Sequence, residues 1–230
     1  MTRLLHISGS PRKDRSRSDM VARRFIGQSG VTDPETLDLE AINLPDFNGA
    51  AIEGRYALIE GREVSPEMHE VWAQIGKTIE HFLSFDTYVF SVPMWNFGVP
   101  WRLKQYIDVL TQPGLTFSVS AEGVTGMAAG RQAILICSGA LDIRPGQADS
   151  ELDFQTAFMK AWLGFIGITD VHVVQVRPTY GTPEQVEAAM AQAYDEAAAL
   201  AERLARAPRV YTRLMLSNVT HCVPSSSSTA

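Results

Sequence analysis

Short apolar segments alternate along the chain with longer segments in which apolar residues recur every three or four positions. Five short segments have the β-branched and aromatic character of buried strands, and they are Leu4–Ser8, Thr36–Asn43, Tyr88–Val92, Gln132–Cys137 and Val171–Val176. Amphipathic helices are predicted around residues 20–26, 66–83, 100–110, 154–165 and 183–204. This alternation predicts a doubly wound α/β fold, in which a parallel sheet carries helices on both faces.

Local signals mark where several of these helices begin. Ser65-Pro66-Glu67 combines a cap, a proline at the first helical position and an acidic first turn. Thr182-Pro183-Glu184-Gln185 reads as a capping box, and Pro100 is predicted to open the helix that follows the third strand. Two further segments stand outside the alternation. Leu115–Val119 and Val124–Ala128 predict a β-hairpin, and Pro45–Glu63 predicts a polar surface insertion with a short helix around Tyr56–Glu60.

Composition restricts the class of protein. The 230 residues suffice for one core, and we assign residues 1–207 to a single domain and 208–230 to a disordered or extended tail. A formal charge of −6 argues against a nucleic-acid partner. We predict a cytoplasmic protein with no membrane segment, because the first apolar run, Leu4–Ile7, is too short for a signal peptide. Cys137 is expected to be a packed core thiol, and the cysteine and histidine spacings predict no metal site.

The loop Pro93–Val99 carries the strongest chemical signal, because it follows the buried third strand. Trp95 and Phe97 offer flat apolar faces, Met94 adds a polarisable one, and Asn96 offers donors and an acceptor in one plane. Ligands of open α/β sheets bind at the carboxyl ends of the strands, so a planar heteroaromatic ring with polar edges would suit this loop. The alternative is a hydrophobic loop that only caps its strand.

The turn after the first strand suggests a phosphate site. It has neither the GxGxxG nor the P-loop pattern, but Ser10, Ser16 and Ser18 lie before or at the start of a helix, with Arg17 among them. Hydroxyls and main-chain N–H groups at a helix N-terminus bind a single phosphate well. The alternative is a polar connection with a capping serine.

The turn after the fourth strand is a weaker signal. Ser138-Gly139-Ala140-Leu141 consists of small residues that let a ligand approach the main chain, although a simple strand-end turn has the same composition. In a 2-1-3-4-5 strand order the three turns converge at the point where flavodoxin-like proteins bind FMN. The sequence predicts no other catalytic cluster, because the histidines are scattered at positions 6, 69, 81, 172 and 221.

These residues carry a resemblance to a known family. The chain resembles the FMN-dependent NADH-azoreductases and NADH:quinone oxidoreductases of the flavodoxin-like class, in segments that span most of residues 1–205. The matching segments are SGSPRKDRSRS (8–18), PMWNFGVPWRLKQYIDVLTQPGLTF (93–117), GVTGMAAGRQAILICS (123–138) and LGFIGITDV (163–171). The family usually has Ser-Arg-Gly-Gly after the fourth strand, where this chain has Ser138-Gly139-Ala140-Leu141, and Trp95 stands where tyrosine is common.

The resemblance implies a homodimer that binds FMN and works by a ping-pong cycle, moving two electrons from NADH to a quinone or azo compound. By position, Ser10, Ser16, Arg17 and Ser18 would hold the phosphate end, and Met94, Trp95, Asn96, Phe97, Ser138 and Gly139 would contact the ring. Phe97, Trp101 and Phe117 would wall the substrate pocket, with hydride transfer at the flavin rather than at a catalytic side chain. Two rival readings are a flavin electron carrier that serves a protein partner and a signalling domain without flavin.

Overall fold

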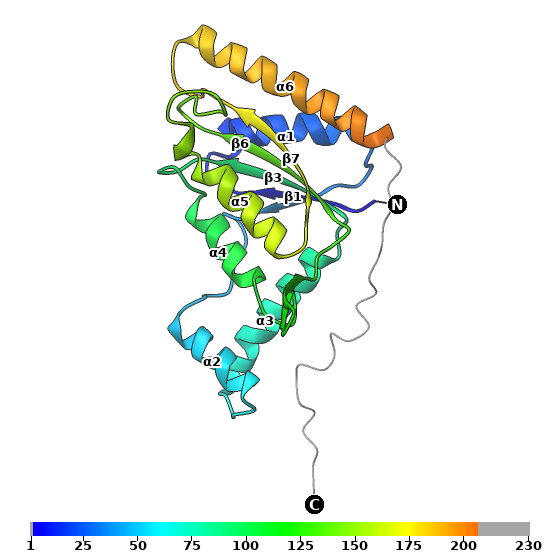
Figure 1. The fold of residues 1–230 in the computed structure, drawn as a ribbon, viewed down its shortest axis with the longest axis vertical. Coiled ribbons are helices and arrows are strands. Elements are labelled where there is room, and N and C mark those ends of the chain that lie inside the picture. Colours follow the sequence, from blue (N-terminus) through cyan, green and yellow to red (C-terminus); the bar gives the residue numbers. More distant parts are fainter. Residues whose placement is uncertain (1, 207–230) are drawn as a thin grey trace, which may run out of the picture.

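A five-stranded parallel sheet lies at the centre of the computed structural model, which describes residues 2–206 (Figure 1). The strands are β1 (Leu4–Ser8), β2 (Glu35–Asp38), β3 (Thr87–Pro93), β6 (Gln132–Ser138) and β7 (Asp170–Val176). Their order is β2-β1-β3-β6-β7, and every neighbouring pair is parallel. This is the predicted 2-1-3-4-5 order, which sets the carboxyl ends of β1, β3 and β6 side by side.

Helices cover both faces of the sheet (Figure 1). One face carries α1 (Arg17–Gln28) and α6 (Pro183–Arg206), whose Phe25 and Leu200 bury against strand residues such as Val89 and Ile134. The other face carries α3 (Pro66–Leu83), α4 (Trp101–Leu110) and α5 (Phe154–Phe165). Successive residues of β3 serve opposite faces, so Val89 belongs to the first core while Tyr88 and Phe90 belong to the second.

Two of the three predicted helix starts form as the sequence indicates. Ser65 accepts a hydrogen bond from the Met68 amide at 3.3 Å and begins α3. In the capping box, the Thr182 amide donates to Gln185 Oε1 at 2.9 Å and the Gln185 amide donates to Thr182 Oγ1 at 3.3 Å. The helix after β3 begins at Trp101, one residue later than predicted, with Pro100 at the capping position.

The second strand and the segment Pro45–Glu63 differ clearly from their predicted bounds. The second strand ends at Asp38 rather than Asn43, because the Asp38 carbonyl and side chain accept from the amides of residues 40–42 and turn the chain. The prediction for Pro45–Glu63 was wrong in extent, since a helix, α2 (Gly49–Ile59), fills much of it. Its buried face consists of Ala51, Gly54 and Ala57, whose small size lets α2 lie close to α3.

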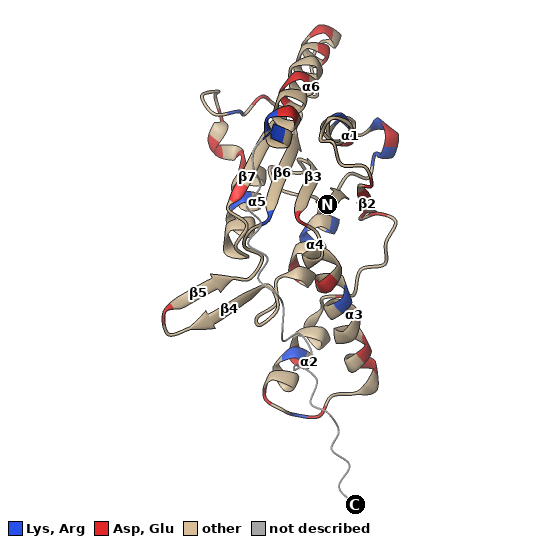
Figure 2. Ribbon diagram, turned by 90° about the vertical axis from the view of Figure 1, so that its right-hand side faces the viewer, with Lys and Arg blue, Asp and Glu red and all other residues tan. Residues whose placement is uncertain are grey.

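The predicted hairpin consists of β4 (Phe117–Ser120) and β5 (Gly123–Gly126), and both strands are shorter than expected. The hairpin projects away from the sheet (Figure 2). At its base, the backbone of Gly126 lies so close to Gly167 that a Cβ at position 126 would lie 2.1 Å from the Gly167 nitrogen. The hairpin therefore packs against the turn after α5 through direct contact between the two main chains.

Other expectations concern single residues and the ends of the chain. Cys137 is buried with a free thiol, as predicted, and burial raises its pKa to about 12. No helix within residues 2–206 is long and apolar enough to cross a membrane, and this part of the chain contains no cluster of metal-binding side chains. The predicted tail, residues 208–230, lies outside the described residues.

Candidate functional site

The three turns singled out in the sequence meet at one cleft of about 170 Å³. Its walls come from the turn after β1 (Ser10, Arg12, Ser16, Arg17), the loop after β3 (Pro93, Met94, Trp95) and the turn after β6 (Ser138, Gly139, Ala140), with Thr179 opposite. The Met94 amide donates to the Ser138 carbonyl at 2.7 Å, so the second and third turns are fixed to each other. The sheet order thus produces a composite site from segments that are far apart in the sequence, since the first and third turns are more than a hundred residues apart.

The turn after β1 presents buried hydroxyl groups to the start of α1. Ser16 caps the helix by accepting from the Asp19 amide at 3.2 Å, and it exchanges a hydrogen bond with Ser18 at 3.2 Å. The first main-chain amides of a helix lack intrahelical acceptors, which makes this end attractive to an anion. Arg17 adds a cation, and its guanidinium donates to the Thr179 carbonyl across the cleft. Lys13 instead forms an ion pair with Asp38.

A buried polar network supports this turn from below. Ser8 donates to Asp19 Oδ2 at 3.0 Å, while the His6 Nε2 atom lies 2.8 Å from Ser91 Oγ and 3.5 Å from Asp19 Oδ1. Burial of Asp19 acts to raise its pKa, but the polar groups of His6, Ser91 and Ser8 around its carboxylate outweigh burial and lower the pKa. Asp19 is therefore held as an anion, and its contacts connect the end of β1 to the start of α1.

The loop after β3 makes a tight turn with unusual backbone geometry. Trp95 and Gly98 exchange two main-chain hydrogen bonds of 3.0 Å, and the two residues between them are left-handed, with φ of 47° at Asn96 and 69° at Phe97. Such a turn normally has glycine at its second central position, whereas asparagine tolerates the first. A left-handed phenylalanine costs on the order of 1 kcal/mol, and such strain gathers at functional sites.

A second cavity, of about 560 Å³, adjoins the first across Trp95. Trp95 lines both cavities, and Asn96 and Trp101 line the second. The remaining walls are Pro11, Glu40, Val99, Pro100 and Lys104. Trp101 is 70% exposed, so the larger cavity opens on an aromatic surface that a flat apolar molecule could contact.

The structure does not bring every predicted site residue to these cavities. Ser18 is fully buried and reaches the cleft only through Ser16, and Phe97 is 42% exposed but lines neither cavity. Phe117 stands on the hairpin, where its ring centroid lies 4.7 Å from that of Phe165. The binding roles of these three residues stay predictions.

Two residues near the cleft were missed by the sequence reasoning. Thr179 follows β7, and its amide donates to the Gly139 carbonyl at 2.9 Å, so it closes the wall opposite the serines. Arg177, also after β7, is completely buried behind Gly139. The available signal was their place after the fifth predicted strand, whose carboxyl end lies at the same edge of the sheet.

A family model described as "flavodoxin-like fold" matches residues 2–201, which is most of the chain. The chain belongs to this flavodoxin-like family. Similar curated proteins include an FMN-dependent NADH:quinone oxidoreductase of Desulfotalea psychrophila, 38% identical over 209 residues that cover 89% of this chain and 98% of that protein. Another is FMN-dependent NADH:quinone oxidoreductase 2 of Pseudomonas syringae pv. tomato, 37% identical over 86% of this chain and 97% of that protein. The predicted family is thereby confirmed.

Solved structures agree with the fold of this flavodoxin-like protein. The azoreductase of Bacillus anthracis str. Sterne superimposes with a TM-score of 0.80 at 25% identity, covering 88% of this chain and 100% of that one. An FMN-dependent NADH-azoreductase of Bacillus anthracis str. Ames Ancestor, solved in complex with FMN, has the same TM-score of 0.80 at 23% identity and covers 89% of this chain. The second likeness concerns the fold alone.

Proposed function

We propose that this flavodoxin-like protein is an FMN-dependent oxidoreductase that moves two electrons from NADH to quinones and azo compounds. The observation that carries the proposal is the single cleft in which Ser10, Trp95 and Gly139 meet from three separate turns. The names of the similar quinone oxidoreductases and azoreductases support the same assignment.

The chemistry of the cleft fits the two ends of FMN. The hydroxyls of Ser10 and Ser16, the first amides of α1 and the cations Arg12 and Arg17 would hold a phosphate. At the other end, Met94 and Trp95 give apolar surface for a ring, and Ser138 and Gly139 give polar main chain beside it. A Cβ at position 139 would lie 3.3 Å from Nε of Arg177, so glycine leaves room for that buried side chain behind the cleft.

When bound, FMN supplies the hydride acceptor and two-electron donor that no side chain provides. The protein orients the reactants and excludes water. Trp95 and Trp101 offer aromatic faces on which a nicotinamide or a quinone would stack, and Asn96 would hydrogen-bond a polar ring edge. If donor and acceptor use this one cavity in turn, the kinetics are ping-pong.

A cytoplasmic homodimer is part of the same proposal. Trp101 and Phe97 leave apolar area on the surface next to the second cavity, and a second subunit would cover such area. Phe117 on the hairpin of one subunit would then line the substrate pocket of the other subunit.

The visible spectrum of the purified protein and a turnover assay test the proposed function together. We expect a yellow protein that releases FMN on denaturation, and consumption of one NADH for each soluble quinone reduced. A protein that is colourless and takes up no added FMN would contradict the proposal. Bound FMN without quinone-dependent NADH consumption would instead favour an electron carrier that serves a protein partner.

Replacing Asn96 tests the proposed hydrogen bond between its carboxamide and the polar edge of a quinone or nicotinamide ring. We expect Asn96→Gly to lower kcat/KM for quinone reduction about tenfold, the value of one polar hydrogen bond, because glycine keeps the left-handed backbone and removes only the carboxamide. Steady-state kinetics at several quinone concentrations measure this change.

Asn96→Ala is the matched control for the backbone. It removes the same carboxamide but strains the left-handed turn, so it should show the same kinetic loss with about 1 kcal/mol less stability to urea than the glycine variant. A glycine variant with wild-type kcat/KM would rule out a ring contact by Asn96.

A further inference from the structure

Arg177 has the largest of the fully buried side chains in residues 2–206. The proposed binding of FMN and substrate assigns no role to its guanidinium. Arg177 follows β7 directly, and its side chain is 0% exposed. Arginine stays protonated in proteins, so this side chain puts a fixed positive charge inside the fold. A buried charge is costly unless its donors are satisfied, and the partners therefore indicate what the charge is for.

Only one of the three guanidinium nitrogens has partners. Nη2 donates to Gln155 Oε1 at 2.7 Å and to Asp153 Oδ1 at 3.2 Å. Nε and Nη1 are buried and have no acceptor among the described residues. Gln155 in turn donates to the Val92 carbonyl at 2.7 Å, which ties the guanidinium to the end of β3.

The unpartnered edge of Arg177 faces the turn that walls the cleft. A Cβ built on Gly139 would lie 3.3 Å from Nε and 3.7 Å from Nη1 of Arg177. Gly139 itself lines the cleft, together with Thr179 from the loop just beyond Arg177. Because position 139 has no side chain, the positive charge lies directly behind the main chain that a ligand in the cleft would touch.

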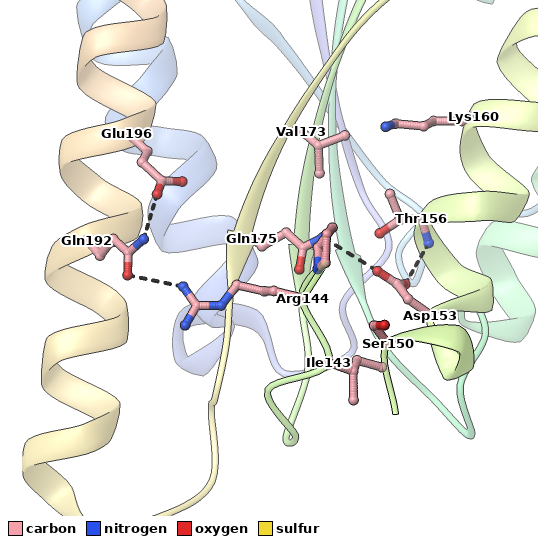
Figure 3. Close-up of a pocket in the computed structure, with 11 residues that line it drawn as sticks. Ile143, Arg144, Ser150, Asp153, Thr156, Lys160, Val173, Gln175, Gln192 and Glu196 are labelled. Atoms are coloured by element: carbon pink, nitrogen blue, oxygen red, sulfur yellow. Dashed lines mark hydrogen bonds between the residues drawn. The ribbon is translucent and has the colours of Figure 1, made fainter. Parts of the chain in front are cut away.

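The counter-charge lies on the opposite side, closer to water. Asp153 caps the N-terminus of α5 and lines a separate cavity of about 360 Å³ between β7, α5 and α6 (Figure 3). There its carboxylate also accepts from the Thr156 amide and from Gln175 (Figure 3). The Asp153 side chain is 11% exposed and that of Arg177 is 0% exposed, so solvent screens the carboxylate better than the guanidinium. The pair consequently leaves a net positive potential on the side of the cleft.

We propose that Arg177 is an electrostatic positioning residue: through Gly139 it favours negative charge on the group held in the cleft, and so raises the reduction potential of bound flavin. This rests on the proposed function, because it takes FMN as that group. Reduction adds electrons to the flavin, so a fixed cation behind the cleft stabilises the reduced form more than the oxidised form.

The midpoint potential of FMN-loaded protein tests this assignment, in the wild type and in the variants Arg177→Met, Asp153→Asn and the double variant. We expect Arg177→Met to weaken the preference for reduced over oxidised flavin about tenfold, which is about 30 mV more negative for a two-electron couple. Asp153→Asn keeps a capping side chain and removes the counter-charge, so its potential should shift in the positive direction. The double variant removes both charges and should lie between the two.

Two further variants separate charge from structure. Arg177→Lys keeps the charge and should stay close to the wild-type potential. Arg144→Met removes a more exposed arginine of the 360 Å³ cavity, which is paired with Asp142, and should leave the potential unchanged. A purely structural role for Arg177 would move the two single variants in the same direction or not at all, and either result overturns the assignment. A wild-type protein that takes up no FMN overturns the proposed function as well, whereas FMN bound at one potential in all variants overturns only the role of Arg177.

Discussion

Gly126→Ala is expected to destabilise the protein by about 3 kcal/mol, because the new methyl group would collide with main chain that cannot move aside. A Cβ there would lie 2.1 Å from the Gly167 nitrogen and 2.2 Å from the Ile166 carbonyl carbon. Relief requires the hairpin to separate from the turn after α5, which threatens the adjoining hydrogen bond from the Ala128 amide to the Ile166 carbonyl at 2.8 Å. Urea unfolding measures the loss in the free energy of unfolding.

Gly164→Ala is the matched control for this substitution. Gly164 lies in α5 only three residues from Gly167, and a Cβ there would meet nothing within 4 Å. Alanine is the better helix former, so this variant should gain about 0.5–1 kcal/mol. Equal effects of the two alanines would show that the contact between Gly126 and Gly167 does not hold the hairpin.

Asp19→Asn is expected to cost about 3 kcal/mol at pH 7, since it breaks a buried polar network and removes its charge. The folded pKa of Asp19 lies below its ordinary value of 3.8. The ionised side chain therefore contributes stability that is fully present above pH 3.8 and is lost as the pH falls through the lower folded pKa. The difference between wild type and variant should shrink in acid, which urea unfolding at pH 7, 5 and 3 measures.

Asp142→Asn provides the surface comparison. The pKa of Asp142 is also lowered, by its hydrogen bonds with Arg144, but both side chains are partly exposed and solvent screens the pair. Its loss should change the free energy of unfolding by less than about 1 kcal/mol at any of these pH values. If Asp19→Asn costs no more than this at pH 7, the network beneath the first turn is not a stabilising one.

The sequence predicted the sheet and most helices because large apolar residues mark them. Tyr88 and Phe90 alternate with Val89 across the sheet, and α3 and α5 repeat large side chains at helical spacing. The prediction failed where small residues or local turns decide the structure. The buried face of α2 is alanine and glycine, which carry little hydrophobic signal, and β2 ends early because Asp38 binds the amides that follow it.

The cleft was predictable in outline because parallel strands bring their carboxyl ends to one edge. Ser10, Trp95 and Gly139 could be assigned to it from their positions after three strands. The left-handed backbone at Phe97 could not be foreseen, since phenylalanine rarely adopts it. Arg177 was equally hidden, because an arginine after a strand normally faces solvent and only the packing behind Gly139 reveals that it is buried.

The glycine contact at the base of the hairpin has a consequence for how this fold can be modified. Val119 and Val124 are exposed on the outer part of β4 and β5, so they take no part in the contact between Gly126 and Gly167. A longer or differently charged turn between β4 and β5 would leave the contact between Gly126 and Gly167 at the base of the hairpin unchanged. Extending this excursion is therefore a direct way to equip the protein with a new recognition surface while the sheet stays in place.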